Sequence, residues 1–216
     1  MFGISKKYLP GLSLFVVIFF APLSARAAEP FQIDAGHSRL GFAVSHLMVS
    51  TVRGEFGDFS GTIQFDKSDL VNSSVDVTIK TASIDTRNPQ RDEHLRMSDF
   101  FDAEKNPMIT FKSTKITGEG SNFVITGQLT MRGVTKEISI PLIIAGPVPS
   151  PFGMEVIGLS GSAKINRQEF GVSWNKQLDA GGVLVGDEVE IEINVEASRK
   201  PQEVPAAVPS DVPATK

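Results

Sequence analysis

Apolar and polar residues alternate strictly along much of this chain. In residues 188–195 every odd position holds Val or Ile, and every even position holds Glu or Asn. A period of two puts alternate side chains on opposite faces of a β-strand, so one face is buried and the other meets water. Residues 38–46 repeat the pattern, with Leu40, Phe42 and Val44 as the apolar positions. Half-buried strands therefore dominate the fold.

Several further segments show the same period between turn sequences. Residues 51–65 fit either two strands around a turn or one long ribbon bent at its glycines. Roughly eight or nine strands with short connections predict an antiparallel barrel or sandwich, because crossover helices have no room. Glycines inside the strand patterns favour the barrel, since coiled strands use them at bends or close approaches. These glycines are Gly41, Gly54, Gly127, Gly158 and Gly161. About eight strands enclose room for side chains or for one small ligand, and the pattern leaves both open.

Residues 88–107 depart from the alternation and are helical and charged in character. Asn88 is a good N-cap, and Pro89 suits the first helical position because its missing N–H would have no partner there. Three apolar residues form an edge along the segment: Leu95, Phe100 and Phe101. We expect a short helix near residues 89–101, which serves either as a lid over a cavity or as a plug for one end of the β-structure.

The two ends of the chain differ from its middle. Residues 1–27 have the charged start, apolar run and small residues of a secretory signal peptide, and the run is too short to span a membrane. Residues 198–216 repeat Val-Pro three times, which predicts an unpacked tail. One folded domain of residues 28–197 remains. We expect it to be periplasmic, or secreted where there is no outer membrane, without stable membrane insertion after the signal is removed.

The charge and cysteine content exclude some classes of partner and site. Loss of the signal peptide removes three basic residues and no acidic one, so the net charge of −4 becomes −7. Nucleic acid is therefore not an expected partner, and anionic membrane surfaces are poor ones, because both require clustered Lys and Arg. The sequence has no Cys. Its stability must come from a hydrophobic core, not from disulfides.

No catalytic or metal-binding motif stands out in the sequence. It has no G-x-S-x-G, phosphate-binding loop, H-E-x-x-H or Cys nucleophile. His37 and His46 have opposite parity, so a regular strand would point them to opposite faces and a shared metal ion is not expected. The acidic residues between Asp85 and Asp102 interleave with arginines, as is typical of a solvated helix. We predict no catalytic residue, metal or cofactor.

Long blocks of the chain carry a family resemblance. They are IDAGHSRLGFAVSHLMVSTVRGEFGDFSGTIQFD at 33–66, SIDTRNPQRDEHLRMSDFFDAEKNPMITFKST at 83–114, LTMRGVTKEI at 129–138, INRQEFGVSWN at 165–175 and GVLVGDEVEIEI at 182–193. In this order they resemble the YceI-like family of exported polyisoprenoid-binding proteins across residues 31–196. The resemblance implies an all-β fold, an extended antiparallel eight-stranded lipocalin-like β-barrel with an internal apolar tunnel.

The resemblance also implies a ligand and positions that would contact it. The ligand would be a long-chain isoprenoid, polyprenyl or quinone-like, or a similar lipid, held for transport, storage or sequestration. The tunnel candidates are Phe42, Val44, Phe56, Phe59, Phe65, Leu95, Phe100, Phe101, Phe111, Leu129 and Trp174. The candidate polar contacts are His37, Arg53, Asp85, Asp92 and His94. Ordinary core packing and structural hydrogen bonds would explain the same residues.

Two other functions stay open on the residues alone. One is an enzyme acting on an isoprenoid or a hydrophobic amide, with His94 and Asp92 as its acid–base pair. The other is a packed barrel without a ligand that serves as a stress-response interaction module. We also expect a homodimer, because extended barrels with exposed strand edges often pair.

Overall fold

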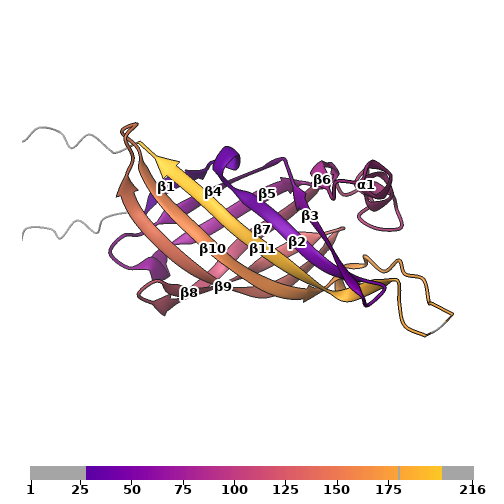
Figure 1. The fold of residues 1–216 in the computed structure, drawn as a ribbon. Helices are drawn as coiled ribbons and strands as arrows, with labels where there is room; N and C mark the ends of the chain where they lie inside the picture. Colours follow the sequence, from indigo (N-terminus) through magenta and orange to yellow (C-terminus); the bar gives the residue numbers. More distant parts are fainter. Residues whose placement is uncertain (1–27, 180, 201–216) are drawn as a thin grey trace, which may run out of the picture.

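The computed structural model describes residues 28–179 and 181–200, which form one antiparallel sheet, one α-helix and four short 3-10 turns (Figure 1). The predicted signal peptide (residues 1–27) and residues 201–216 lie outside the described part. The strands are β1 (Glu29–Ile33), β2 (Arg39–His46), β3 (Ser50–Phe56), β4 (Phe59–Phe65), β5 (Ser74–Lys80), β6 (Ile84–Asp85), β7 (Met108–Glu119), β8 (Asn122–Met131), β9 (Val134–Pro149), β10 (Glu155–Asn166) and β11 (Val185–Arg199). The helical elements are η1 (Ala35–His37), η2 (Leu70–Asn72), η3 (Thr81–Ser83), α1 (Pro89–Arg96) and η4 (Arg167–Phe170).

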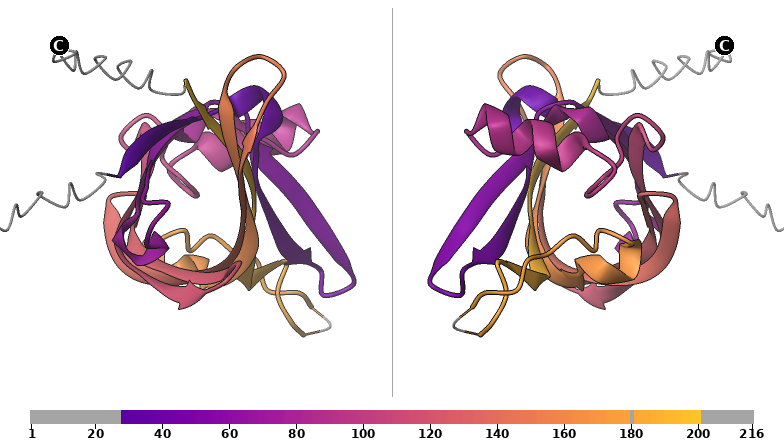
Figure 2. Two further views of the ribbon diagram at one scale, coloured as in Figure 1. Left: turned by 90° about the vertical axis from the view of Figure 1, so that its left-hand side faces the viewer. Right: turned by 90° about the vertical axis from the view of Figure 1, so that its right-hand side faces the viewer.

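Eight of the strands close into a ring. Hydrogen bonds join β1, β4, β5, β7, β8, β9, β10 and β11 in that order. The ring closes where β1 pairs with β11, through Gln32 with Ser198 and Ile33 with Ala197. The protein is therefore a closed eight-stranded antiparallel β-barrel, which confirms the barrel predicted from the sequence. The two views of Figure 2 look at its opposite ends.

Three neighbouring parts of the barrel wall are each interrupted once. β1 leads through η1 into β2, β3 leads into β4, and β5 leads through η3 into β6. The β3–β4 break lies beside η3, because the Gly57 N–H donates to the Ser83 carbonyl at 3.1 Å and the Lys80 N–H donates to the Asp58 carbonyl at 2.9 Å. It lies beside η1 on its other side, because Gln32 pairs with Thr62 and Leu40 pairs with Phe56. β3 and β4 pair with β2 and β1 and not with each other, so residues 51–65 form the bent ribbon.

The breaks divide the barrel into two ends. Beyond them, β2 pairs with β11 and β3, and β6 pairs with β3 at Glu55 and Phe56 only. We call this the cap end, because residues 88–107, the cap, lie there and lead from β6 to β7 (Figure 1). The opposite end, with β1 and the β9–β10 hairpin, is the base.

The helix is shorter than the sequence suggested. It ends at Arg96, not near residue 101, and Met97 has an extended backbone. The chain folds back at once, so that the N–H groups of Phe101 and Ala103 donate to the carbonyls of Leu95 and Arg96 at 3.1 and 2.9 Å. These return bonds satisfy carbonyls that a helix terminus leaves without partners.

The tail begins later than residue 198. Ser198 pairs with Gln32 in the sheet, and Arg199 is the last residue of β11. The Arg199 side chain is about 10% exposed and forms ion pairs with Glu29 and Glu155. The predicted boundary at 198 is therefore wrong, because the inward positions of β11 continue through Ala197 to this paired arginine.

The inward apolar faces form two clusters of buried residues. In the base cluster the rings of Phe31 and Phe65 meet edge to face at 5.5 Å, close to Ile125 and Ile157. The cluster at the cap end consists of Ile109, Leu129, Met131 and Phe170. Strand alternation therefore supplies a core at both ends of the barrel.

Candidate functional site

An internal cavity of about 210 Å³ takes in residues from both clusters. Every strand of the eight-stranded ring contributes to its wall. Among the described residues that line it, all except Gly41 and Arg167 have apolar side chains. Such a wall offers almost no hydrogen bonds to water, so an apolar molecule is its natural occupant.

Two glycines let phenylalanine rings into the cavity wall. A Cβ added at Gly54 would lie 2.5 Å from Cζ of Phe42, and one added at Gly127 would lie 2.6 Å from Cζ of Phe111. Both rings line the cavity. At these two positions the sheet needs glycine because a ring lies against its backbone.

The first turn of α1 is fastened to the segment before it. Asn88 caps the helix, its side-chain oxygen accepting the Arg91 N–H at 3.1 Å. Asp92 is only 6% exposed and accepts from the N–H and the hydroxyl of Thr86 at 2.9 and 2.5 Å. Arg91 donates to the hydroxyl and the carbonyl of Thr86 at 2.7 and 2.9 Å. The first helical turn is therefore held by one buried polar network.

The last turn of α1 is fastened by Arg96. Its Nε donates to the Ala82 carbonyl at 2.8 Å, and its Nη2 donates to the Ile84 carbonyl at 3.0 Å. The sequence pattern suggested that the arginines here neutralise neighbouring acids. Arg96 instead binds backbone oxygens of η3 and β6, so it anchors the helix to the barrel wall.

The inner side of the cap joins the cavity. Leu95, Phe100 and Phe101 all line it, and Phe100 is 6% exposed. The His94 ring meets Phe100 and Trp174 edge to face at 5.0 and 5.2 Å, and Phe100 lies 5.2 Å from Trp174. This aromatic triad connects α1, the cap loop and the segment after η4.

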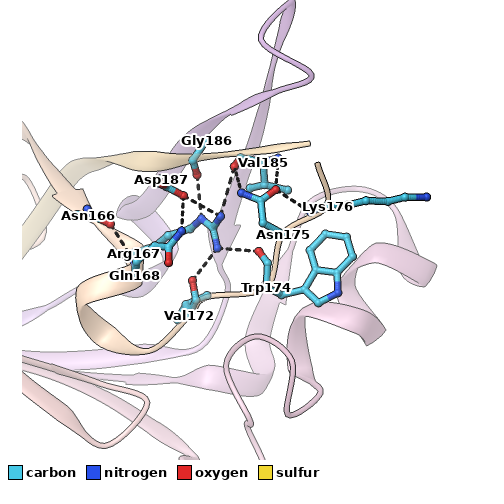
Figure 3. A network of polar contacts seen from close by, with 10 residues as sticks. All are labelled: Asn166, Arg167, Gln168, Val172, Trp174, Asn175, Lys176, Val185, Gly186 and Asp187. Carbon is cyan, nitrogen blue, oxygen red and sulfur yellow. Dashed lines mark hydrogen bonds and ion pairs between the residues drawn. The ribbon is translucent and has the colours of Figure 1, made fainter. Parts of the chain in front are cut away.

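Among the described residues that line the cavity, Arg167 is the one with a charged side chain. Figure 3 shows its surroundings. It is 4% exposed. Its Nη1 donates to the carbonyls of Val172 and Trp174 at 2.6 and 2.9 Å. Its Nη2 donates to the Val185 carbonyl at 3.3 Å and to the Asp187 carboxylate at 3.1 Å, and its Nε donates to the Gly186 carbonyl at 2.8 Å. Burial lowers the pKa of the guanidinium, and Asp187 opposes this shift. Because a guanidinium has five N–H donors and five acceptors surround it, Arg167 fixes the chain around the cavity end.

Arg132 joins the cap to the segment after η4. It lies in the β8–β9 turn with φ 51°. Its Nη1 donates to the Gly171 carbonyl at 2.6 Å, and its Nη2 donates to the Ser98 carbonyl at 2.8 Å. The cap is thus tied to the rest of the barrel by arginines on two sides.

Eight of the eleven tunnel candidates line the cavity. These are Phe42, Val44, Phe56, Leu95, Phe100, Phe101, Phe111 and Leu129. Phe59, Phe65 and Trp174 do not. Phe59 is buried just after the β3–β4 break, and Phe65 meets Phe31 edge to face in the base cluster. The Trp174 ring contacts the Phe100 ring but does not itself line the cavity. Ligand contact by any of these side chains stays a prediction.

The structure puts none of the five polar candidates in the cavity wall. Arg53 forms an ion pair with Glu192 on the outer face, because its position in β3 has the opposite parity to Phe56. Asp85 is exposed and accepts the Arg87 N–H at 2.6 Å. The remaining three are His37, Asp92 and His94.

The remaining candidates have partners of their own. His37 lies on the surface and contacts Asp34 at 2.8 Å, which raises the pKa of His37 and lowers that of Asp34. Asp92 binds Thr86, whereas His94 contacts Asp99 at 3.3 Å. The structure therefore does not assemble Asp92 and His94 as an acid–base pair.

Sequence reasoning missed Arg167, although a signal for it existed. Ile157, Leu159 and Ile165 share its parity, so the alternation of β10 places an arginine on the apolar side. It also missed a surface group of Asp34, His37 and Glu196, whose ligand-type atoms lie within 4.8 Å of one another. In that group His37 is exposed and the two carboxylates are half-buried, and hydrogen bonding between Asp34 and His37 already accounts for their closeness.

Within the described residues, no helix has the length and apolar character needed to cross a bilayer. The sequence matches the YceI-like domain over residues 31–197. It is 37% identical over 193 residues to Protein YceI of Escherichia coli O17:K52:H18, covering 88% of this chain and 97% of that protein. It is 36% identical over 195 residues to a UPF0312 protein of Pseudomonas aeruginosa, covering 90% of this chain and 99% of the relative.

Solved structures share the barrel. The YCEI protein of Campylobacter jejuni has a TM-score of 0.62 at 37% identity, and the match covers 73% of this chain and 90% of the Campylobacter chain. BcnA of Burkholderia cenocepacia has a TM-score of 0.67 at 25% identity and covers 76% and 98%. A polyisoprenoid binding domain from Saccharophagus degradans is similar in fold alone, with a TM-score of 0.60 at 14% identity and coverage of 79% and 98%.

Proposed function

Because the chain belongs to the YceI-like family, we propose that it is an exported binding protein that holds the hydrocarbon chain of a long isoprenoid, or of a similar lipid, inside its barrel. The protein would work in the periplasm as a carrier or store, without chemistry of its own. That a polyisoprenoid binding domain has the same fold supports this choice of ligand.

The observation that carries the proposal is the apolar wall of the cavity. The wall continues from Ile33 and Ile63 near the base to Leu95 and Val185 at the cap end. Each buried CH₂ group contributes roughly 0.8 kcal/mol, so a long hydrocarbon can bind there with few polar contacts. Arg167 donates its hydrogen bonds to the protein, so it orders the wall and does not serve as a head-group anchor.

The cap end is the proposed entrance. Leu95, Phe100 and Phe101 separate the cavity from solvent there, and the cap is held by discrete arginine contacts and not by a continuous sheet. The hydrocarbon tail would lie toward the base, and the polar head of the ligand would stay near the cap.

Native mass spectrometry of protein purified without detergent tests the proposal. We expect a lipid adduct, and we expect saturable uptake of a long prenyl alcohol or quinone after the adduct has been stripped. A matched pair of variants locates the site: Val189→Trp fills the cavity, whereas Glu188→Trp places the same ring on the exposed face. Uptake should be lost in the first variant and kept in the second.

Three results would contradict the proposal. These are the absence of any adduct from membrane-derived preparations, uptake that Val189→Trp leaves unchanged, and recovery of a chemically altered lipid. The last result would favour an enzyme. A periplasmic fraction that lacks the mature chain cleaved near residue 27 would contradict the proposed location.

A further inference from the structure

The turn between β2 and β3 combines an unfavourable backbone with exposed apolar side chains. Leu47 and Met48 both have positive φ, 53° and 61°, and the Val49 N–H donates to the His46 carbonyl at 3.2 Å. The register pairs His46 with Ser50, so three residues connect the strands, and Leu47 and Met48 are the central residues of the β-turn closed by that hydrogen bond. β-Turns with positive φ at both central residues strongly prefer Asn-Gly or Asp-Gly. The side chains of Leu47, Met48 and Val49 are 36%, 61% and 84% exposed.

This arrangement lowers stability, and the contacts it gains are few: the Leu47 N–H donates to the Leu184 carbonyl, and the end of the Met48 side chain lies against Gly182. A left-handed backbone brings Cβ of a bulky residue close to the following carbonyl, and exposed apolar surface gains nothing from folding. The β8–β9 turn of the same barrel, Arg132-Gly133, also has positive φ at both positions but places glycine second. Local rules are broken in this way mainly where a function requires it.

The turn lies next to the cavity at the cap end. Val44 and Val185 line the cavity, and Val185 pairs with His46 just before the turn. The Leu47 N–H donates to the Leu184 carbonyl at 2.9 Å. The hairpin projects from the cap end in Figure 1 and in the right-hand view of Figure 2. A surface that meets this turn therefore also meets the cavity end.

The chemistry of the turn fits a lipid surface. No Asp, Glu, Lys or Arg occurs from Leu40 to Val52, so the turn itself carries no charge that would have to leave water. The segment that meets the turn through Leu184 carries charges at Lys176 and Asp179. Three side chains on a convex three-residue turn offer far less than the roughly 800 Å² per partner of a stable protein interface. Apolar side chains at such a tip are suited to the headgroup–acyl boundary of a bilayer.

We propose that Leu47, Met48 and Val49 form a membrane wedge, which inserts into the headgroup–acyl boundary of the bilayer leaflet that faces the protein. Insertion would place the cap end of the cavity against the bilayer for lipid exchange. The inference rests on the proposed function, since it assigns the wedge to the same cavity. Insertion is apolar and not electrostatic. Binding should therefore occur on zwitterionic vesicles and should change little with salt.

Flotation with phosphatidylcholine vesicles tests the wedge. The double variant Leu47→Asn/Met48→Gly installs the preferred turn residues, so it should raise the melting temperature while vesicle binding falls by about tenfold or more. The matched control is Phe152→Ser, because Phe152 is 89% exposed at the β9–β10 hairpin of the base. This control should bind vesicles like the unchanged protein.

Each outcome of the flotation experiment supports or overturns the wedge. Loss of flotation in the double variant alone supports the wedge. Equal flotation of the double variant and the unchanged protein, equal loss in the Phe152→Ser control, or no flotation at all overturns it. The wedge is also overturned if the protein transfers its lipid to a protein acceptor without binding vesicles. Native mass spectrometry of the same samples reports lipid retention separately, so failure of the proposed function and failure of the wedge are distinguishable.

Discussion

A single buried arginine organises one end of the cavity. Arg167 is surrounded by four carbonyls and Asp187, while its neighbours in the wall are apolar. A buried guanidinium is costly unless all its donors are used, and here all are used. Its presence therefore specifies the path of residues 172–174 and 185–187 more than it adds net stability.

Replacing Arg167 should destabilise the barrel. Arg167→Met leaves buried carbonyls without donors, so urea denaturation should show a loss of about 2–4 kcal/mol in the free energy of unfolding. Arg167→Lys keeps the charge but lacks the five-donor fork, and it should lose part of that amount. Lys164→Met, which removes an exposed lysine of β10, is the control and should unfold close to the original midpoint. An unchanged midpoint in Arg167→Met would show that the network is dispensable.

The Asp34–His37 pair predicts a pH dependence at the surface. Hydrogen bonding to Asp34 raises the pKa of His37 above 6.5, and the same contact lowers the pKa of Asp34 below 3.8. The His37 contribution is fully present below its unfolded pKa and is lost as the pH rises through the folded pKa. The Asp34 contribution is present above its unfolded pKa and is lost as the pH falls through the folded one.

The pair therefore stabilises the fold between about pH 4 and pH 6.5. NMR titration of the His37 ring should give a pKa above 6.5, and Asp34→Asn should bring it back toward that value. A His37 pKa that ignores Asp34→Asn would contradict the contact.

The alternation of apolar and polar residues predicts which side chains point into the barrel. Candidates are misplaced where this alternation is not applied to charged residues. Arg53 has the opposite parity to Phe56, and Arg167 has the same parity as Ile165, so the pattern already put one outside and the other inside. Asp92 could not be placed this way, because its partner Thr86 comes from an irregular segment without a period.

The cap is the element where local sequence signals fail first. Asn88 and Pro89 mark the helix start correctly, since both capping and chain entry are local. The early end at Arg96 depends on return bonds from Phe101 and Ala103, which are set by how Phe100 packs into the cavity. A tertiary contact thus overrides the helical pattern.

Removing the aromatic side of the cap should release the ligand. Phe100→Ala with Phe101→Ala takes two rings out of the cavity wall, so a bound prenyl probe should dissociate at least about tenfold faster. Stopped-flow measurement with a fluorescent prenyl probe gives the rate. Arg96→Ala loosens only the anchor of the helix and should have a smaller effect, and Met97→Ala, with an exposed side chain, should have none. Equal acceleration in all three variants would mean that the cap acts only as structure.

At the scale of the whole molecule, the closed ring makes one long apolar interior. The barrel class and its antiparallel connections follow from period-two strands with short turns. The prediction of an internal tunnel comes from the family resemblance and not from this pattern. The size of the cavity does not follow from the sequence, because inward Phe, Ile and Val side chains either fill a barrel or line one.

Affinity should grow with the chain length of the ligand. Each added isoprene unit buries five more carbons, worth up to about 4 kcal/mol before the cost of ordering the chain, so affinities of prenyl alcohols should rise by at least about tenfold per unit until the cavity is full, and then level off. Isothermal titration over a series of chain lengths measures this. Affinities that depend on the head group and not on the chain would contradict an apolar tunnel.

The three aligned breaks have a mechanical consequence. Hydrogen bonds run around the barrel, so the girth of the base is set by the complete ring. At η1, at Gly57-Asp58 and at η3 the three neighbouring wall segments all change direction along one line. The wall beyond this crease, formed by β2, β3 and β6, keeps its own ladder bonds and joins the ring through the pairing of β2 with β11. The bore of the base is thus held by a closed set of ladder bonds, whereas the rim at the cap end includes an open sheet edge at β6, so the two ends of one wall are held by different contacts.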